Sequence, residues 1–116
     1  MVFTVLANIV LCPFSHILAT TNTSLYVLVQ DVSNNDLGVL RLKVIAPITG
    51  WNEAFSLAAW MVKIEPNSDN GLSKRSAVDT FQVRSVSQQR LIKQVGTLSD
   101  EIMDEVSKAL GVVLNI

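Results

Sequence analysis

The apolar residues of this chain change their spacing once, close to the C-terminus. Before that point they form short runs rich in Val, Ile, Leu and Phe, a pattern typical of β-strands. We therefore predict a mainly β fold that ends in one helix, from about Ser99 to Leu110. Ser99 or Thr97 can cap its first turn, and Gly111 is placed to end it. The apolar residues of this segment recur on one helical face, at Ile102, Met103, Val106, Ala109, Leu110 and Val113.

Turn-forming residues divide the β-rich part into short predicted strands. In the segment 79–87 we expect Phe81, Val83 and Val86 to face the core. Five or six short strands with one helix predict a small β-barrel whose open end the helix seals. A chain of 116 residues is one domain, residues 1–116. The predicted strands cover residues 1–14, 25–32, 40–49, 58–65 and 79–87, with a short sixth strand at 90–95.

The composition restricts the chemistry that the chain can perform. Nine basic and ten acidic residues give a formal charge of −1, yet eight of the nine bases lie between residues 41 and 93. One cysteine and one histidine exclude an intramolecular disulfide and a Cys/His zinc site within one chain. The sequence contains no Gly-rich phosphate loop, nucleophile elbow or HExxH motif. We therefore expect neither a metal nor a cofactor.

The first 18 residues include thirteen apolar ones and admit two interpretations. An export signal needs a preceding positive charge, and a membrane span needs about 20 continuous apolar residues; the segment has neither. We favour the other interpretation, a buried strand closed by Pro13. This interpretation predicts a cytoplasmic protein with no membrane partner.

Polar and aromatic residues within the basic stretch are the best candidates for a binding site. Residues of these types can hold a single-stranded nucleic acid through phosphate neutralisation, base stacking and hydrogen bonds to base edges. A tryptophan is also typical of a core or a dimer interface, so the residues alone leave both interpretations open. The candidates are Thr49, Trp51, Gln82, Arg84 and Ser85, with Lys43, Lys74 and Arg75 beside them.

Three segments carry a more specific signal: residues 44–51 (VIAPITGW), 70–91 (NGLSKRSAVDTFQVRSVSQQRL) and 96–110 (GTLSDEIMDEVSKAL). In this order they resemble the PemK/MazF family of toxin endoribonucleases from bacterial type II toxin–antitoxin systems. The resemblance implies the small SH3-like barrel of the PemK, MazF and CcdB toxins, a homodimer, and metal-independent cleavage of single-stranded mRNA. It also implies a cognate antitoxin that holds the toxin inactive.

The resemblance also implies roles for single residues. Thr49 matches the threonine that assists catalysis, and Gln82 matches a glutamine of the strand that lines the RNA groove. Arg84 and Ser85 continue that motif and are expected to bind substrate. Trp51 is expected to bind substrate as well, because an aromatic ring can stack on a base. In metal-free cleavage the 2′-OH attacks its own phosphate, which requires a site that moves two protons and stabilises a phosphorane.

One position departs from the family pattern. The family has an arginine followed by proline just before the V-L-V run, where this chain has Leu25 and Tyr26. Neither side chain supplies the permanent charge and bidentate phosphate contact of a guanidinium. The departure predicts weakened catalysis, with Tyr26 or His16 as candidates for proton transfer.

Two alternative functions compete with a ribonuclease. One is a non-catalytic barrel that keeps dimerisation and antitoxin or RNA binding. The other is a gyrase inhibitor built on the same barrel, which the P-x-T and Q-V-R motifs oppose.

Overall fold

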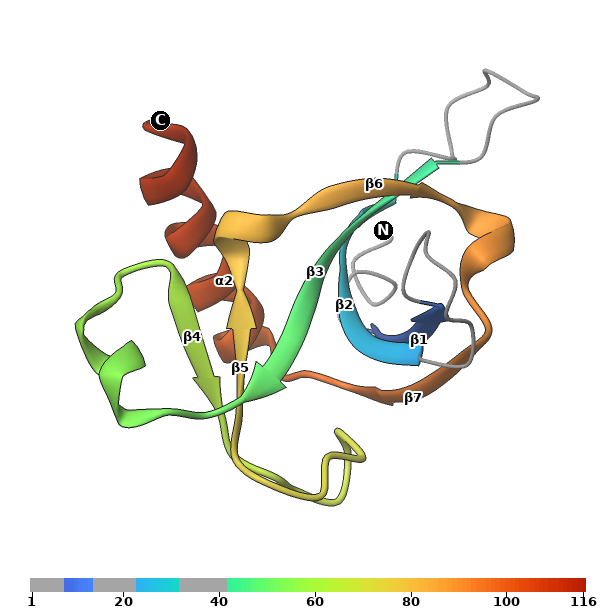
Figure 1. Ribbon diagram of the computed structural model, residues 1–116, viewed down its shortest axis with the longest axis horizontal. Helices are drawn as coiled ribbons and strands as arrows, with labels where there is room; N and C mark the ends of the chain where they lie inside the picture. The colour runs from blue at the N-terminus through green and yellow to red at the C-terminus, as the bar shows by residue number, and fades with distance from the viewer. Residues whose placement is uncertain (1–7, 14–22, 32–41) are drawn as a thin grey trace.

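The computed structural model describes residues 8–13, 23–31 and 42–116 (Figure 1). Three short 3₁₀ helices interrupt the strands of this part, and helix α2 (Asp100–Leu114) follows the last strand. The 3₁₀ helices are η1 (Glu53–Leu57), η2 (Thr80–Gln82) and η3 (Gln88–Arg90). The strands are β1 (Asn8–Pro13), β2 (Thr23–Asp31), β3 (Leu42–Gly50), β4 (Met61–Ile64), β5 (Ser76–Asp79), β6 (Arg84–Ser87) and β7 (Lys93–Thr97).

Strand β3 is the centre of the sheet because it pairs with three other strands. One edge pairs antiparallel with β2. The other edge pairs with β6 in its first half and with β5 from Ile48 to Gly50. β4 continues the sheet beyond β5, and β1 and β7 continue it beyond β2. Figure 1 shows β6 and β7 framing β1 and β2, with α2 behind β4 and β5.

The predicted fold class, antiparallel β with a C-terminal helix, is confirmed. The barrel is less complete than the sequence analysis expected. In the part of the chain that the structure describes, the end strands β4 and β7 do not pair with each other, so the sheet stays open.

The single strand predicted for residues 79–87 is wrong, because η2 divides it into β5 and β6. The break falls opposite Pro47, between the pairs Ile48–Val78 and Ile45–Arg84. Proline has no N–H to donate to a neighbouring strand. An interruption of the pairing at this point therefore loses few backbone hydrogen bonds. Phe81 belongs to η2 and is 60% exposed, contrary to the inward orientation predicted for it. Val86, on β6, is buried as expected.

The ends of three other elements differ from the predicted ones. η1 and the turn after it occupy the stretch before Met61, so β4 is shorter than the predicted segment 58–65. Because η3 occupies Gln88–Arg90, the last strand begins later than predicted and covers Lys93–Thr97 in place of residues 90–95. Helix α2 continues through Gly111 to Leu114, and the C-cap is Asn115, whose backbone is left-handed (φ 60°).

Both faces of β2 are buried, since successive residues of a strand point to opposite sides. Tyr26 and Leu28 pack in one cluster with Val10, Ile45 and Val86. Val27 belongs to a larger cluster, which Val106 and Ala109 of α2 help to fill. The predicted apolar helix face is confirmed at its centre, because Val106 is 1% exposed. The remaining members of the larger cluster are Ile9, Ala46, Val62, Ile64, Leu72, Val78 and Leu98.

The N-terminal apolar run is described only in part. Asn8–Pro13 is a strand in which Ile9 is fully buried, in line with the predicted buried strand. The rest of that run lies outside the described residues. Among the residues described, no helix combines the length and the apolar character that a membrane crossing requires.

Candidate functional site

Thr49 and Gln82 line one open pocket of about 330 Å³, between β3, η1, β4 and η2. Two residues that were assigned to the same site, 33 positions apart, are therefore brought together. The other lining residues are Pro47, Phe55, Ala58, Trp60, Met61 and Asp79.

The position of Thr49 follows from the pairing of β3. Thr49 lies one residue before the end of β3, opposite Ala77 of β5, and its side chain is exposed. Trp51 continues this pairing, since its N–H donates to the Arg75 carbonyl at 3.1 Å. The side chain of Thr49 is thus held on regular strand backbone and is exposed at the pocket.

Gln82 reaches the pocket because η2 is tied to the start of β4. The backbone N–H and the hydroxyl of Thr80 both donate to the Trp60 carbonyl, at 3.2 and 2.7 Å, and Thr80 is fully buried. This double contact fixes the short helix whose last residue is Gln82.

Asp79 orients Gln82 and is a residue that the sequence analysis missed. Its Oδ2 accepts from Gln82 Nε2 at 2.9 Å, while its Oδ1 accepts from the Phe81 N–H at 3.1 Å and so caps η2. An ionised carboxylate only accepts, so the amide group of Gln82 turns its NH₂ toward Asp79. An Asp followed two residues later by a free N–H is a turn signal that could have identified this role.

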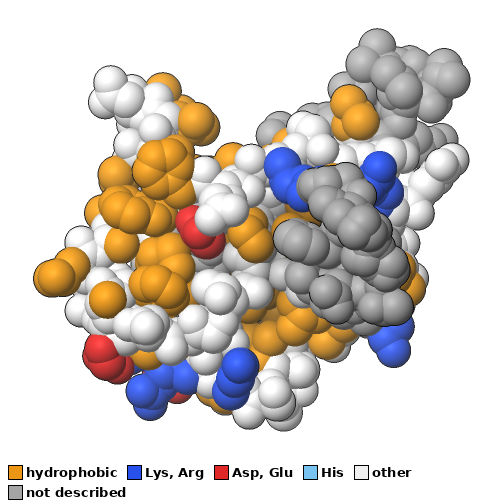
Figure 2. All heavy atoms as spheres, viewed as in Figure 1, with side chains coloured by type: hydrophobic (Ala, Val, Ile, Leu, Met, Phe, Trp, Pro, Cys, Tyr) orange, Lys and Arg blue, Asp and Glu red, His pale blue; other side chains and the backbone are white. Residues whose placement is uncertain are grey.

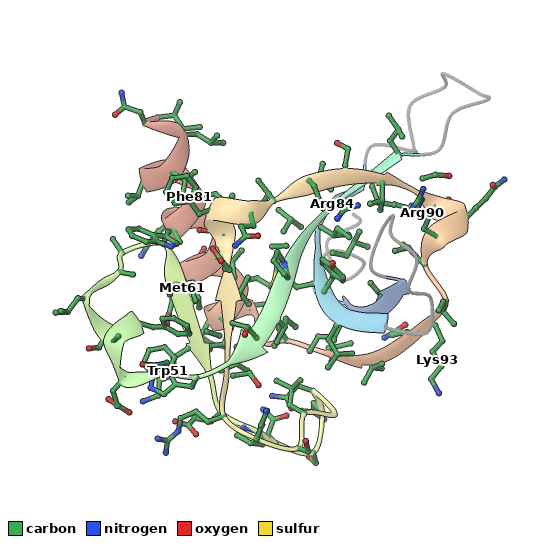
Figure 3. The ribbon with its side chains drawn as sticks, in the orientation of Figure 1. Trp51, Met61, Phe81, Arg84, Arg90 and Lys93 are labelled. Atoms are coloured by element: carbon green, nitrogen blue, oxygen red, sulfur yellow. The ribbon has the colours of Figure 1, made fainter. Side chains whose placement is uncertain are left out.

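Two aromatic pairs flank the pocket. The Trp60 and Phe81 rings meet edge to face with centroids 5.4 Å apart, and the Trp51 and Phe55 rings do so at 5.7 Å. Figure 3 places Phe81 and Trp51 on opposite sides of Met61. Phe55 and Trp60 contribute directly to the lining. Flat aromatic walls of this kind are suited to stacking against a nucleobase.

The other three predicted substrate-binding residues lie outside this pocket. Trp51 is not among its lining residues; its Nε1 donates to Glu53 Oε2 at 3.0 Å, and Lys63 Nζ lies 5.0 Å from its ring centroid. Arg84 and Ser85 are exposed on β6, opposite Ile45 and Val44 of β3. In Figure 3 Arg84, on β6, lies well away from Trp51, which follows the end of β3.

A second, smaller pocket of about 170 Å³ adjoins Thr49. Thr49 lines both pockets and so lies where they meet. Leu25, at the position where the family pattern has arginine, forms part of the second pocket. The other lining residues are Ile48, Gly50, Leu72, Ser73, Lys74 and Ser76.

The two residues considered for proton transfer are not brought to the site. Tyr26 is 3% exposed within the core and lines neither pocket. His16 lies outside the described residues. A larger hollow of about 900 Å³ follows the C-terminal half of α2, and none of the predicted site residues line it. Among the described side chains, no three or more His, Cys, Asp or Glu residues are grouped so that they could hold a metal.

Solved structures define the class of this fold. The Mycobacterium tuberculosis toxin MazF-mt6 is 17% identical with a TM-score of 0.67, over 94% of this chain and 97% of that one. An endoribonuclease in complex with its cognate antitoxin, from Mycobacterial species, is 15% identical with a TM-score of 0.71, over 95% and 93%. A chain of the MazE–MazF complex (Form-III) of Deinococcus radiodurans is 18% identical with a TM-score of 0.70, over 100% and 99%. The fold is therefore that of MazF toxins.

The family follows from the sequence match. Residues 7–114 match the model of the PemK-like, MazF-like toxins of type II toxin–antitoxin systems. Since the match covers nearly the whole chain, this protein belongs to that family, as the three sequence segments indicated. A search of curated proteins found no match.

Proposed function

We propose that this toxin is a metal-independent endoribonuclease that cleaves single-stranded mRNA in the cytoplasm and is held inactive by a cognate antitoxin. The observation that supports the proposal most is the shared pocket of Thr49 and Gln82, with aromatic walls beside it. Hydroxyl and amide groups can donate to the oxygens of a phosphorane, and aromatic rings can hold an adjacent base.

The reaction needs no reagent beyond RNA. The 2′-OH loses its proton and attacks the neighbouring phosphorus, and the bond from phosphorus to the 5′-oxygen breaks. The leaving 5′-oxygen takes up a proton, so the products are a 2′,3′-cyclic phosphate and a 5′-hydroxyl end. In this proposal Arg84 and Ser85, exposed on β6 outside the pocket, contact phosphates further along the RNA strand.

We expect slower turnover than in a relative with arginine at position 25. Leu25 lines the second pocket, and its apolar side chain cannot stabilise the charge of a phosphorane. The same observation favours the second candidate function, a non-catalytic toxin fold that binds RNA or antitoxin as a dimer. Cleavage separates the two candidates.

The first experiment is an assay of the purified chain with a mixed-sequence single-stranded RNA in the presence of EDTA. We expect cleavage at the same rate with EDTA and with added Mg²⁺, and products that carry 2′,3′-cyclic phosphate ends. A DNA strand of the same sequence, which lacks the 2′-OH, is the matched control and should stay intact. Binding of the RNA without cleavage would support the non-catalytic candidate, and products with 5′-phosphate ends would contradict the mechanism.

Exposed apolar side chains support the homodimer that we also propose. Leu57, Leu114 and Ile116 are 92%, 57% and 94% exposed. Figure 2 shows hydrophobic side chains gathered over the region of β4, η1 and α2. Apolar groups collected on a small protein mark a surface for association. We expect sedimentation at micromolar concentration to give twice the chain mass of 12.7 kDa, and a stable monomer would contradict the proposal.

A further inference from the structure

Three basic side chains lie around the end of β3, and two of them are already engaged. Arg75 Nε lies 3.1 Å from Glu65 Oε1. Lys63 Nζ lies 3.8 Å from Glu65 Oε2 and also over the Trp51 ring. The third, Lys74, is exposed and has no ion-pair partner among the described residues.

The side chain of Lys74 lies against the backbone beside Thr49. A Cβ built on Gly50 would be 3.4 Å from Lys74 Nζ and 3.5 Å from its Cε. Since position 50 has no side chain, the ammonium group can lie over the end of β3. Lys74 therefore forms a wall of the second pocket together with Thr49 and Leu25.

The backbone around Lys74 is fixed. Its own carbonyl accepts from the Ser76 hydroxyl at 2.8 Å, and the carbonyl of the next residue, Arg75, accepts from the Trp51 N–H at 3.1 Å. Gly50 pairs with Ser76 two residues further along. The backbone position of Lys74 is thus fixed, while its side chain is exposed to solvent.

We propose that Lys74 is a catalytic residue, the cation that contacts the phosphate being cleaved. This inference rests on the proposed ribonuclease function. Attack by the 2′-OH places a second negative charge on the non-bridging oxygens, and a cation at that point stabilises the transition state. With Thr49 between the two pockets, a phosphate on the Thr49 hydroxyl has Lys74 on one side and Gln82 on the other.

A lysine is a point charge and cannot make the bidentate contact of a guanidinium. The chain would thus keep the charge required for cleavage, supplied from the loop before β5, while losing the fork geometry. A lysine in this place would explain how the chain cleaves RNA with leucine in place of arginine at position 25.

The test compares Lys74→Met, which keeps the stem and removes the charge, with Lys74→Arg and the matched control Lys93→Met on β7. Under single-turnover conditions Lys74→Met should slow cleavage by about tenfold or more. Lys74→Arg should stay within about threefold of the parent, because the charge remains. Lys93→Met should match the parent, since it removes the same charge from an exposed lysine of β7 that lines neither pocket. Anisotropy with an uncleavable DNA strand measures binding, which should weaken less than cleavage does.

A second arm asks whether a cation at position 25 serves the same phosphate. Leu25→Arg should raise the rate by about tenfold or more in the Lys74→Met background and clearly less in the parent, because one phosphate needs only one cation. Multiplicative effects of the two substitutions would overturn the proposal.

The outcomes separate the inference from the function on which it rests. If the parent cleaves, Thr49→Ala is slow and Lys74→Met is as fast as the parent, Lys74 is not catalytic and the ribonuclease proposal stands. If the parent is inert and Leu25→Arg cleaves, Lys74 does not supply the required charge and the inference is wrong. If no variant cleaves RNA, the ribonuclease proposal fails and the inference fails with it.

Discussion

Gly96→Ala should destabilise the folded chain by about 3 kcal/mol, because the new methyl group would be forced into backbone. A Cβ on Gly96 would lie 2.3 Å from the Asn70 carbonyl oxygen and 2.7 Å from that of Asp69. The two segments are already joined at this point, since the Thr97 N–H donates to the Asp69 carbonyl at 3.0 Å.

The segment that faces Gly96 cannot move aside cheaply. Asn70 is 1% exposed, and its Oδ1 accepts from the N–H groups of Asn67 and Leu72 at 3.2 and 3.0 Å. Its Nδ2 donates to the Glu65 carbonyl at 2.9 Å. Displacing this buried side chain would leave several polar groups without partners, which is the costly alternative to the steric clash.

Gly111→Ala is the matched control for this prediction. A Cβ there would meet its nearest neighbour, the Ile116 carbonyl oxygen, at 3.5 Å, an ordinary contact. Because Gly111 lies inside α2, alanine should stabilise the fold by about 0.5 to 1 kcal/mol. Urea denaturation of both variants gives the comparison. Equal midpoints would show that the contact between Gly96 and Asn70 is misassigned.

The residues GTLSDE (96–101) therefore have mainly structural roles. Gly96 allows the close approach to Asn70, Leu98 is buried, and the Ser99 hydroxyl accepts from the Ile102 N–H at 3.2 Å as the helix N-cap. The N-cap was predicted from local sequence because capping depends on residues three positions apart. The role of Gly96 was not, because its partner lies 26 residues earlier in the chain.

Local patterns identified the elements but not their interruptions. The strand period through residues 79–87 gave no sign of η2, whose cause is the cross-strand neighbour Pro47 together with the Asp79 cap. Gly111 was predicted to end the helix, yet the residue with left-handed backbone is Asn115. The first error arises because a cross-strand neighbour decides between local options, and the second because a helix tolerates an interior glycine at a modest cost.

The candidate site was predicted in part. The family resemblance supplied Thr49 and Gln82, and the pairing of β3 with β5 places them together. Phe55, Trp60 and Asp79 were not selected, since a pocket wall depends on the path of η1 and η2. Trp51 lies outside the pocket because η1 and Glu53 hold its indole elsewhere.

The burial of Tyr26 rules out one obvious variant. Restoring the family's Arg-Pro pair would put proline at position 26, in a strand that lies between β1 and β3. A proline there removes a backbone donor, and the replacement also empties a buried site in the second core cluster. Leu25→Arg alone therefore tests the missing guanidinium without this damage.

Thr49→Ala should lower the single-turnover rate of RNA cleavage by about 10² to 10³, the scale for loss of one donor aimed at transition-state charge. This corresponds to about 3 to 4 kcal/mol of the activation free energy. The residue lies where the two pockets meet, so its hydroxyl is the one group that both the Gln82 side and the Lys74 side of a bound phosphate would share.

Two further variants at the same position separate the hydroxyl from the shape of the side chain. Thr49→Val keeps the β-branched form that suits a strand and should be as slow as Thr49→Ala, whereas Thr49→Ser keeps the donor and should recover most of the rate. Thr49 is exposed at the end of β3, so all three variants should melt close to the parent. If Thr49→Val cleaved as fast as the parent, the hydroxyl would have no part in the reaction, and the amide of Gln82 would be the next donor to replace.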